Sequence, residues 1–112
     1  MSQFTSILAL KALDGLTARA AVTSQNIANA NSPGYRPLKV SFEAALAEAA
    51  AQGPTAVEAM EPTVDRDLDP AQASGVRLDL QMATSSMTTA RYAALVEILS
   101  LQMQQTRTAL GA

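Results

Sequence analysis

A ten-residue stretch divides this 112-residue chain into a helical beginning and a turn-rich continuation; it reads Asn26-Ile27-Ala28-Asn29-Ala30-Asn31-Ser32-Pro33-Gly34-Tyr35. The ring of Pro33 disfavours the α conformation at Ser32, so we expect a helix of residues 3–30 to end at this point. Pro33 and Gly34 suit the central positions of a type II turn, because proline fixes φ at about −65° and glycine accepts a positive φ. The stretch therefore predicts a long helix that stops at a tight turn.

Three asparagines and a tyrosine crowd this helix end. Asn26 and Asn29 lie three residues apart on one helical face, where their amides are able to bond the last carbonyls of the helix or a neighbouring chain. Tyr35 is an anchor in a protein interface, a role that aromatic side chains often have, or a staple that holds the turn against the helix, and these two roles do not exclude each other. Both alternatives are open at this point.

The first helix has a large apolar surface and little charge. Heptad spacing selects one seam, made of Ala9, Leu13, Leu16, Ala20, Thr23, Ile27 and Ala30. A second, weaker stripe roughly opposite holds Phe4, Leu8 and Val22. A helix on the surface of a monomer usually carries a charged face, but this one has three scattered charges, so we expect partners on more than one side.

A second long helix is predicted over residues 78–110, again with few charges. One apolar seam consists of Leu80, Ala83, Met87, Ala90, Ala94, Ile98 and Leu101. A neighbouring seam consists of Tyr92, Leu95, Leu99, Met103 and Leu110. Antiparallel pairing of the two long helices through their seams would bury both and still leave apolar stripes facing outward, which is a route to assembly.

The middle of the chain has a different composition. Ser41 is placed to cap a short, alanine-rich helix of residues 43–52. Residues 53–75 hold three prolines and five acidic residues, which is typical of a mobile linker. We therefore predict an all-α fold, in which two long terminal helices pair as an antiparallel coiled-coil-like hairpin beside a turn-rich, partly disordered middle. The expected segments are 1–35 (helix and turn motif), 36–75 (short helix and flexible acidic linker) and 76–112 (C-terminal helix).

The chemistry of the chain points away from catalysis. Cysteine and histidine are absent, which removes the usual thiol–imidazole and hydroxyl–imidazole pairs of nucleophilic catalysis. Residues 65–69 resemble the first half of a calcium loop, but Pro70 stands where that loop needs glycine and Val76 where it needs glutamate. We therefore expect a solvated acidic linker here, and a protein with no enzymatic activity, cofactor or metal.

The charge and the hydropathy pattern limit the kinds of partner and the location that we expect. The net charge is −2 and the basic residues are scattered, so we expect no nucleic-acid partner. No run of residues has the length of a membrane span, and the first residues lack the pattern of a cleaved secretory signal. We therefore expect a protein that does not insert into membranes and that is either cytoplasmic or exported without a cleaved signal.

The asparagine-rich motif of residues 26–35 resembles the signature of the bacterial flagellar axial proteins, which form the rod, the hook and related parts. Asn31 and Ser32 stand where that family more often has aspartate and threonine. The following residues 36–42, Arg-Pro-Leu-Lys-Val-Ser-Phe, are similar more narrowly to the B-type proximal rod proteins of this family, as is the ending 104–110.

The beginning of the second helix extends this resemblance. Residues 76–82 are similar to the rod-protein pattern Val-Asp-Leu-Glu-x-Glu-Met, although Arg77 and Gln81 replace two of its acids. The matching segments together cover both long helices and leave the acidic linker unmatched. Arg91-Tyr92 also fits an aromatic step that is common in these proteins.

The resemblance implies a structural subunit of the proximal rod in the flagellar basal body, within the periplasmic space. It implies export by the flagellar type III apparatus and contacts with other rod proteins, with further copies of itself, and with membrane-ring or export-gate components at the rod base. The residues expected to serve assembly are Leu13, Leu16, Asn26, Ile27, Asn29, Pro33, Gly34, Tyr35, Met87, Leu95, Ile98 and Leu101. The alternative is a cytoplasmic helical adaptor or coiled-coil interaction module, which localisation would distinguish.

Overall fold

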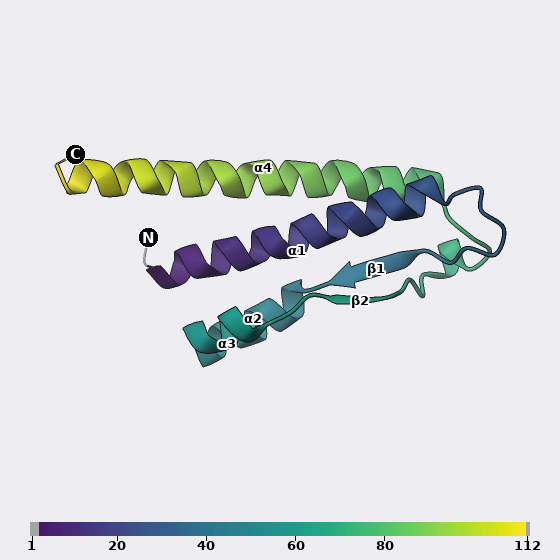
Figure 1. Ribbon diagram of the computed structural model, residues 1–112, viewed down its shortest axis with the longest axis horizontal. Helices are drawn as coiled ribbons and strands as arrows, with labels where there is room; N and C mark the ends of the chain where they lie inside the picture. Colours follow the sequence, from purple (N-terminus) through teal and green to yellow (C-terminus); the bar gives the residue numbers. More distant parts are fainter. Residues whose placement is uncertain (1–2, 112) are drawn as a thin grey trace.

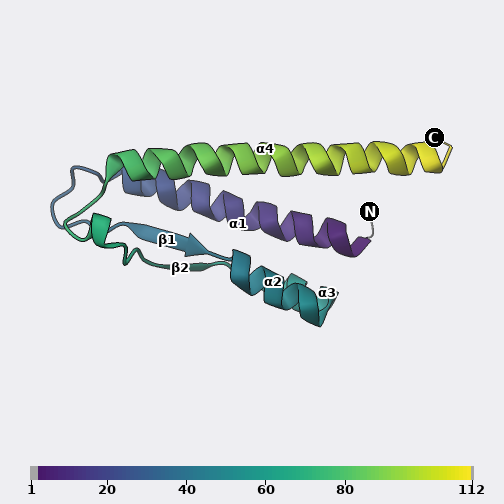
Figure 2. The ribbon, with the colours of Figure 1, turned by 180° about the vertical axis from the view of Figure 1, so that it is seen from behind.

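The central layer of the molecule is one long helix, α1 (Gln3–Ala28), which is covered on two sides (Figure 1). The computed structural model describes residues 3–111 and measures 59 × 27 × 16 Å. The second long helix, α4 (Leu78–Ala109), runs antiparallel along one side of α1. The shorter elements pack against the other side, and the view from behind gives the same order of layers (Figure 2). Two long helices were predicted, and both are present.

The shorter elements form a strand–helix–helix–strand unit between the two long helices in sequence. They are β1 (Leu38–Ser41), α2 (Glu43–Gln52), α3 (Pro54–Ala59) and β2 (Thr63–Arg66), followed by the 3-10 turn η1 (Pro70–Gln72). β1 and β2 pair antiparallel, with Val40 opposite Val64 and Lys39 opposite Asp65. The predicted short helix of residues 43–52 is thus present as α2.

The expectation of an all-α fold is wrong in this middle unit. Residues 53–75, predicted to be a linker, contain α3 and β2. The pattern Leu-Lys-Val-Ser of β1 alternates between the core and solvent as a strand should, but four residues are too few to signal a strand on their own. Ser41 does not cap α2, because it lies in β1, and Phe42 occupies the cap position without a side-chain hydrogen bond.

The turn after α1 has the predicted geometry. The backbone N–H of Tyr35 donates to the carbonyl of Ser32 at 3.2 Å, and Gly34 has φ of 75°. A positive φ at the second central position is what distinguishes a type II turn. α1 itself ends at Ala28, two residues earlier than expected.

The apolar core lies between α1 and the middle unit. Its fully buried members are Leu16, Val40, Phe42, Ala49, Val57 and Met60. Gly15 makes this packing possible, since a Cβ atom at that position would lie 2.6 Å from the ring of Phe42. α4 contributes to this core only through the partly buried Leu95 among the described residues.

Candidate assembly surface

α4 is the most exposed apolar element of the chain. The large apolar side chains that remain 41–59% exposed along it are Leu78, Met82, Met87, Tyr92, Val96, Ile98, Leu101 and Met103. α1 has one such side chain among the described residues, Leu10. Because α4 packs against α1 on one side and little else, its other sides face solvent. A surface of this kind is typical of a region that binds another protein.

The seam by which α4 meets α1 is not the first of the two predicted for it. Met87, Ile98 and Leu101 are about half exposed, at 54%, 47% and 52%. The contact seam instead contains Gln81, Ser85, Thr88, Leu95 and Leu99, which are buried or partly buried and follow one another at steps of three, four or seven residues. Leu95 and Leu99 belong to the second predicted seam. The first half of this seam is polar, and an apolar heptad search therefore overlooks it.

The polarity of that half-seam is explained by Asn26, whose side chain is 1% exposed. Its amide nitrogen donates to the carbonyl of Leu38 at 2.8 Å and to the Oε1 of Gln81 at 3.0 Å. Its amide oxygen accepts from the N–H of Leu38 at 3.0 Å and from the hydroxyl of Tyr35 at 2.9 Å. Both amide protons and both acceptor sites are thus satisfied, which burial of an amide requires.

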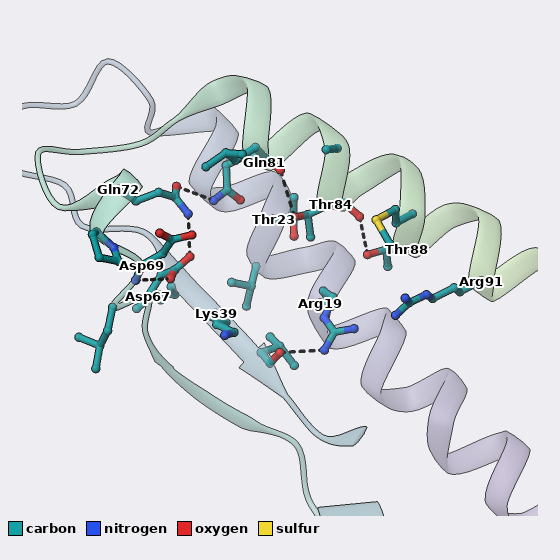
Figure 3. Close-up of a pocket in the computed structure, with 18 residues that line it drawn as sticks. Arg19, Thr23, Lys39, Asp67, Asp69, Gln72, Gln81, Thr84, Thr88 and Arg91 are labelled. Atoms are coloured by element: carbon teal, nitrogen blue, oxygen red, sulfur yellow. Dashed lines mark hydrogen bonds between the residues drawn. The ribbon is translucent and has the colours of Figure 1, made fainter. Parts of the chain in front are cut away.

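The network continues through two further amides into the loop before α4 (Figure 3). The Nε2 of Gln81 donates to the Oε1 of Gln72 at 2.9 Å, and the Nε2 of Gln72 donates to Asp67 at 2.7 Å. Gln72 and Gln81 are each 4% exposed. This chain of hydrogen bonds joins α1, β1, η1 and the first turn of α4, so it fixes how α4 is placed on α1.

The side chains of the asparagine-rich motif therefore form hydrogen bonds within this chain. Tyr35 holds the turn against α1 through its bond to Asn26, so the staple alternative is confirmed. Asn29 donates to the carbonyl of Gln25 at 2.9 Å and accepts from Ser32 at 3.0 Å, which closes the end of α1. The turn itself, from Asn31 to Gly34, is exposed and accessible to a neighbour.

The remaining predicted assembly residues also separate into interior and surface positions. Leu16 is 3% exposed and belongs to the core. Leu13, Ile27 and Leu95 are partly buried. Of the twelve residues expected to serve assembly, the apolar ones that remain accessible in the single chain are thus Met87, Ile98 and Leu101 on α4, besides Pro33 at the turn.

Arg19 is an interaction centre that the sequence did not reveal. Its guanidinium binds both carboxylate oxygens of Glu43 at 2.7 Å, donates to the carbonyl of Val40 at 2.9 Å and lies 4.8 Å above the ring of Phe42. These hydrogen bonds lower the pKa of Glu43 to about 2. Arg91 of α4 approaches the same carboxylate at 3.7 Å. In the sequence, the one indication of this role is that Arg19 is one of only three charged residues on α1.

A groove of about 730 Å³ lies between the first half of α4, α1 and β1 (Figure 3). Apolar side chains from all three elements line it, among them Val22, Leu38, Leu80 and Met87. Arg19, Lys39 and Arg91 surround one end, and Asp67 and Asp69 the other. The groove adjoins the exposed apolar side chains of α4, because Met87 lines the groove and is also 54% exposed.

No protein-family model matches this chain, and no curated protein matches it. Within residues 3–111, no group of three or more acidic side chains is arranged to hold a metal ion. No helix of this part of the chain has the length and hydropathy needed to cross a bilayer.

Proposed function

We propose that this protein is a structural subunit of the proximal rod in the bacterial flagellar basal body. The observation that carries the proposal is the outward stripe of α4, defined here as Met87, Ala90, Ala94, Ile98 and Leu101. Three of these side chains are large, apolar and about half exposed, and no charge interrupts the set. A solvent-facing stripe with this spacing is the surface that a helical assembly needs for contacts between subunits.

Two further features support the proposal. The motif of residues 26–35, with its turn at Pro33 and Gly34, resembles the signature of the axial family and has a well-defined structural role at the end of α1. The molecule is elongated, which suits side-by-side packing of long helices. In this proposal the protein leaves the cytoplasm by the flagellar type III apparatus and binds other rod proteins, further copies of itself and components at the rod base.

The proposal is tested by electron microscopy of basal bodies extracted from a strain that lacks this protein. We expect membrane rings without rods in the deletion strain and normal rods after complementation. Intact rods in the deletion strain would overturn the proposal. Localisation of the protein in the cytosol of the complemented strain would then favour the alternative of a helical adaptor.

A single substitution tests the stripe itself. Leu101→Asp places a charge in the proposed apolar contact, so we expect export of the variant but no incorporation into rods, and loss of motility. Ser100→Asp is the matched control, because it adds the same charge one residue away on an exposed position outside the stripe. Normal flagella with Leu101→Asp would exclude the stripe as an assembly contact.

A further inference from the structure

The two edges of the small sheet differ in what covers them. In an antiparallel pair, backbone groups point alternately toward the partner strand and away from it. The bond from the N–H of Asp67 to the carbonyl of Pro37, at 3.0 Å, fixes this alternation. Thr63 and Asp65 therefore point their backbone groups toward β1, and Val64 and Arg66 point theirs away.

On the β1 side the outer edge is closed by side chains of α1. Asn26 bonds both the N–H and the carbonyl of Leu38, as a neighbouring strand would. Arg19 bonds the carbonyl of Val40. Leu38 and Val40 are the residues opposite Arg66 and Val64, so these contacts agree with the alternation derived above.

The outer edge of β2 has no such cover. All four of its residues are exposed, and β2 lies on the side of β1 that faces away from α1 (Figure 1). Among residues 3–111, no loop or side chain bonds the backbone of Val64 or Arg66. Val64 is 48% exposed and the following Leu68 is 84% exposed, so uncovered apolar surface adjoins the free backbone groups. An open edge with this character is a template for another strand.

The charges decide what kind of strand fits. If a second copy of β2 added antiparallel and bonded both Val64 and Arg66, Asp65 would face Asp65 of that copy. Like charges directly opposite each other destabilise a strand pair. The nearby Glu61, Asp67 and Asp69 make this edge more acidic still. On its inner side Asp65 already faces Lys39, and Val64 faces Val40, which shows the pairing that these side chains favour.

We propose that β2 is a strand-addition site for an extended segment of a different protein, with a lysine or arginine opposite Asp65 and an apolar residue opposite Val64. Backbone hydrogen bonds to Val64 and Arg66 would hold the segment in register. Its apolar side chain would cover the exposed part of Val64. The added strand would turn a two-stranded ribbon, which is marginal by itself, into a three-stranded sheet.

The test is an NMR titration of the full-length, isotope-labelled protein with the acetylated and amidated peptide Thr-Val-Lys-Val-Thr. We expect the amide signals of Val64 and Arg66 to shift most, because these groups gain hydrogen bonds. The same peptide with glutamate in place of lysine should bind about fivefold more weakly, because it sets like charges opposite each other. No shift at Val64 and Arg66 would overturn the proposal, and equal binding of the two peptides would overturn the assignment of a cationic partner.

Two variants test whether the peptide binds at the outer edge of β2. Val64→Pro removes an outward N–H but leaves the bonds to β1 intact, so it should abolish binding and preserve the remaining spectrum. Asp65→Lys should reverse the preference, so that the glutamate peptide binds more tightly than the lysine peptide. If Val64→Pro does not fold, the reversal by Asp65→Lys decides the question by itself. Since the isolated protein is titrated, the outcome does not depend on any flagellar phenotype.

Discussion

The two long helices are alike in sequence and different in their surroundings. Each has only three or four charged residues over more than 25 positions. α1 nevertheless lies between two layers, whereas α4 has one neighbour and exposes most of its large apolar side chains. Low charge on a helix therefore indicates that several of its sides are meant to be covered. Low charge does not indicate which chain covers those sides. For α1 the same chain covers them, and for α4 we propose that another chain does.

The largest difference between the helices should appear in the free energy of unfolding when one leucine in each is replaced by alanine. Leu16→Ala removes a side chain that is 3% exposed in α1 and should lower the free energy of unfolding by about 3 kcal/mol. Leu101→Ala removes a half-exposed side chain of α4 and should cost under about 1 kcal/mol. Urea unfolding followed by circular dichroism measures both, and equal losses would contradict the difference in cover.

Asn26 is the point where α1 holds α4 through buried polar groups. Asn26→Ala leaves the amide of Gln81 and both backbone groups of Leu38 without this partner, so we expect a loss of about 2–3 kcal/mol. Asn29→Ala is the matched control, because that amide bonds the carbonyl of Gln25 and the hydroxyl of Ser32 at an exposed helix end, so its loss should cost about 1 kcal/mol or less. A smaller effect at Asn26 than at Asn29 would refute the role assigned to the network.

Each long helix is followed by a glycine with a positive φ. Gly34, in the turn after α1, has φ of 75°, and Gly111, after α4, has φ of 74°. A β-branched residue is strained at such an angle by roughly 1–2 kcal/mol. Gly34→Val should lose this amount, because the turn is tied to α1 through Tyr35. Gly111→Val should lose less, because Gly111 is exposed and its N–H bonds the carbonyl of Thr108 in the last turn of α4, so that this turn is able to unwind locally and relieve the strain. Thermal unfolding of the two variants gives the comparison directly.

The smallest expected effect concerns Glu43, which binds Arg19 of α1 closely and Arg91 of α4 loosely. Its pKa is lowered from the ordinary value of 4.5 to about 2, so the stabilisation is complete above pH 4.5 and is lost as the pH falls toward 2. The side chain is 52% exposed, so solvent screening limits the contribution to about 1 kcal/mol.

Arg19→Ala and Arg91→Ala separate the two helices in this interaction. Unfolding free energies measured between pH 5 and pH 2 should lose much of their acid dependence in Arg19→Ala and keep it in Arg91→Ala. Equal changes in the two variants would mean that α4 is attached to α2 as firmly as α1 is.

Features that depend on local chemistry were predictable from the sequence. The two long helices, the stop before Pro33 and the positive φ of Gly34 follow from periodicity and from the geometry of proline and glycine. The lack of charge on α1 correctly predicted contacts on more than one side. These properties depend on residues that are close together in the chain, so a single sequence is enough to predict them.

Features that depend on distant residues were not predictable. β1 and β2 are each four residues long and are stabilised by pairing across more than twenty residues, which leaves little local signal. The first half of the α4 seam was missed because Gln81 and Thr88 look like surface residues in the sequence. In the structure Gln81 bonds Asn26, and the hydroxyl of Thr88 bonds the carbonyl of Thr84. Gly15 gave a usable hint, since a glycine within a helix often marks a close approach, here of the Phe42 ring.

The position of the apolar core along the chain has a consequence for synthesis. Its fully buried members all fall within residues 16–60, and β2 ends at Arg66. A nascent chain leaves the ribosome from its N-terminus, so every part of this core is available before α4 has been translated. The last third of the polypeptide is then added to a surface that already exists. Substitutions along its outer side therefore leave the fully buried core residues unchanged, and that side is free to evolve with whatever it binds.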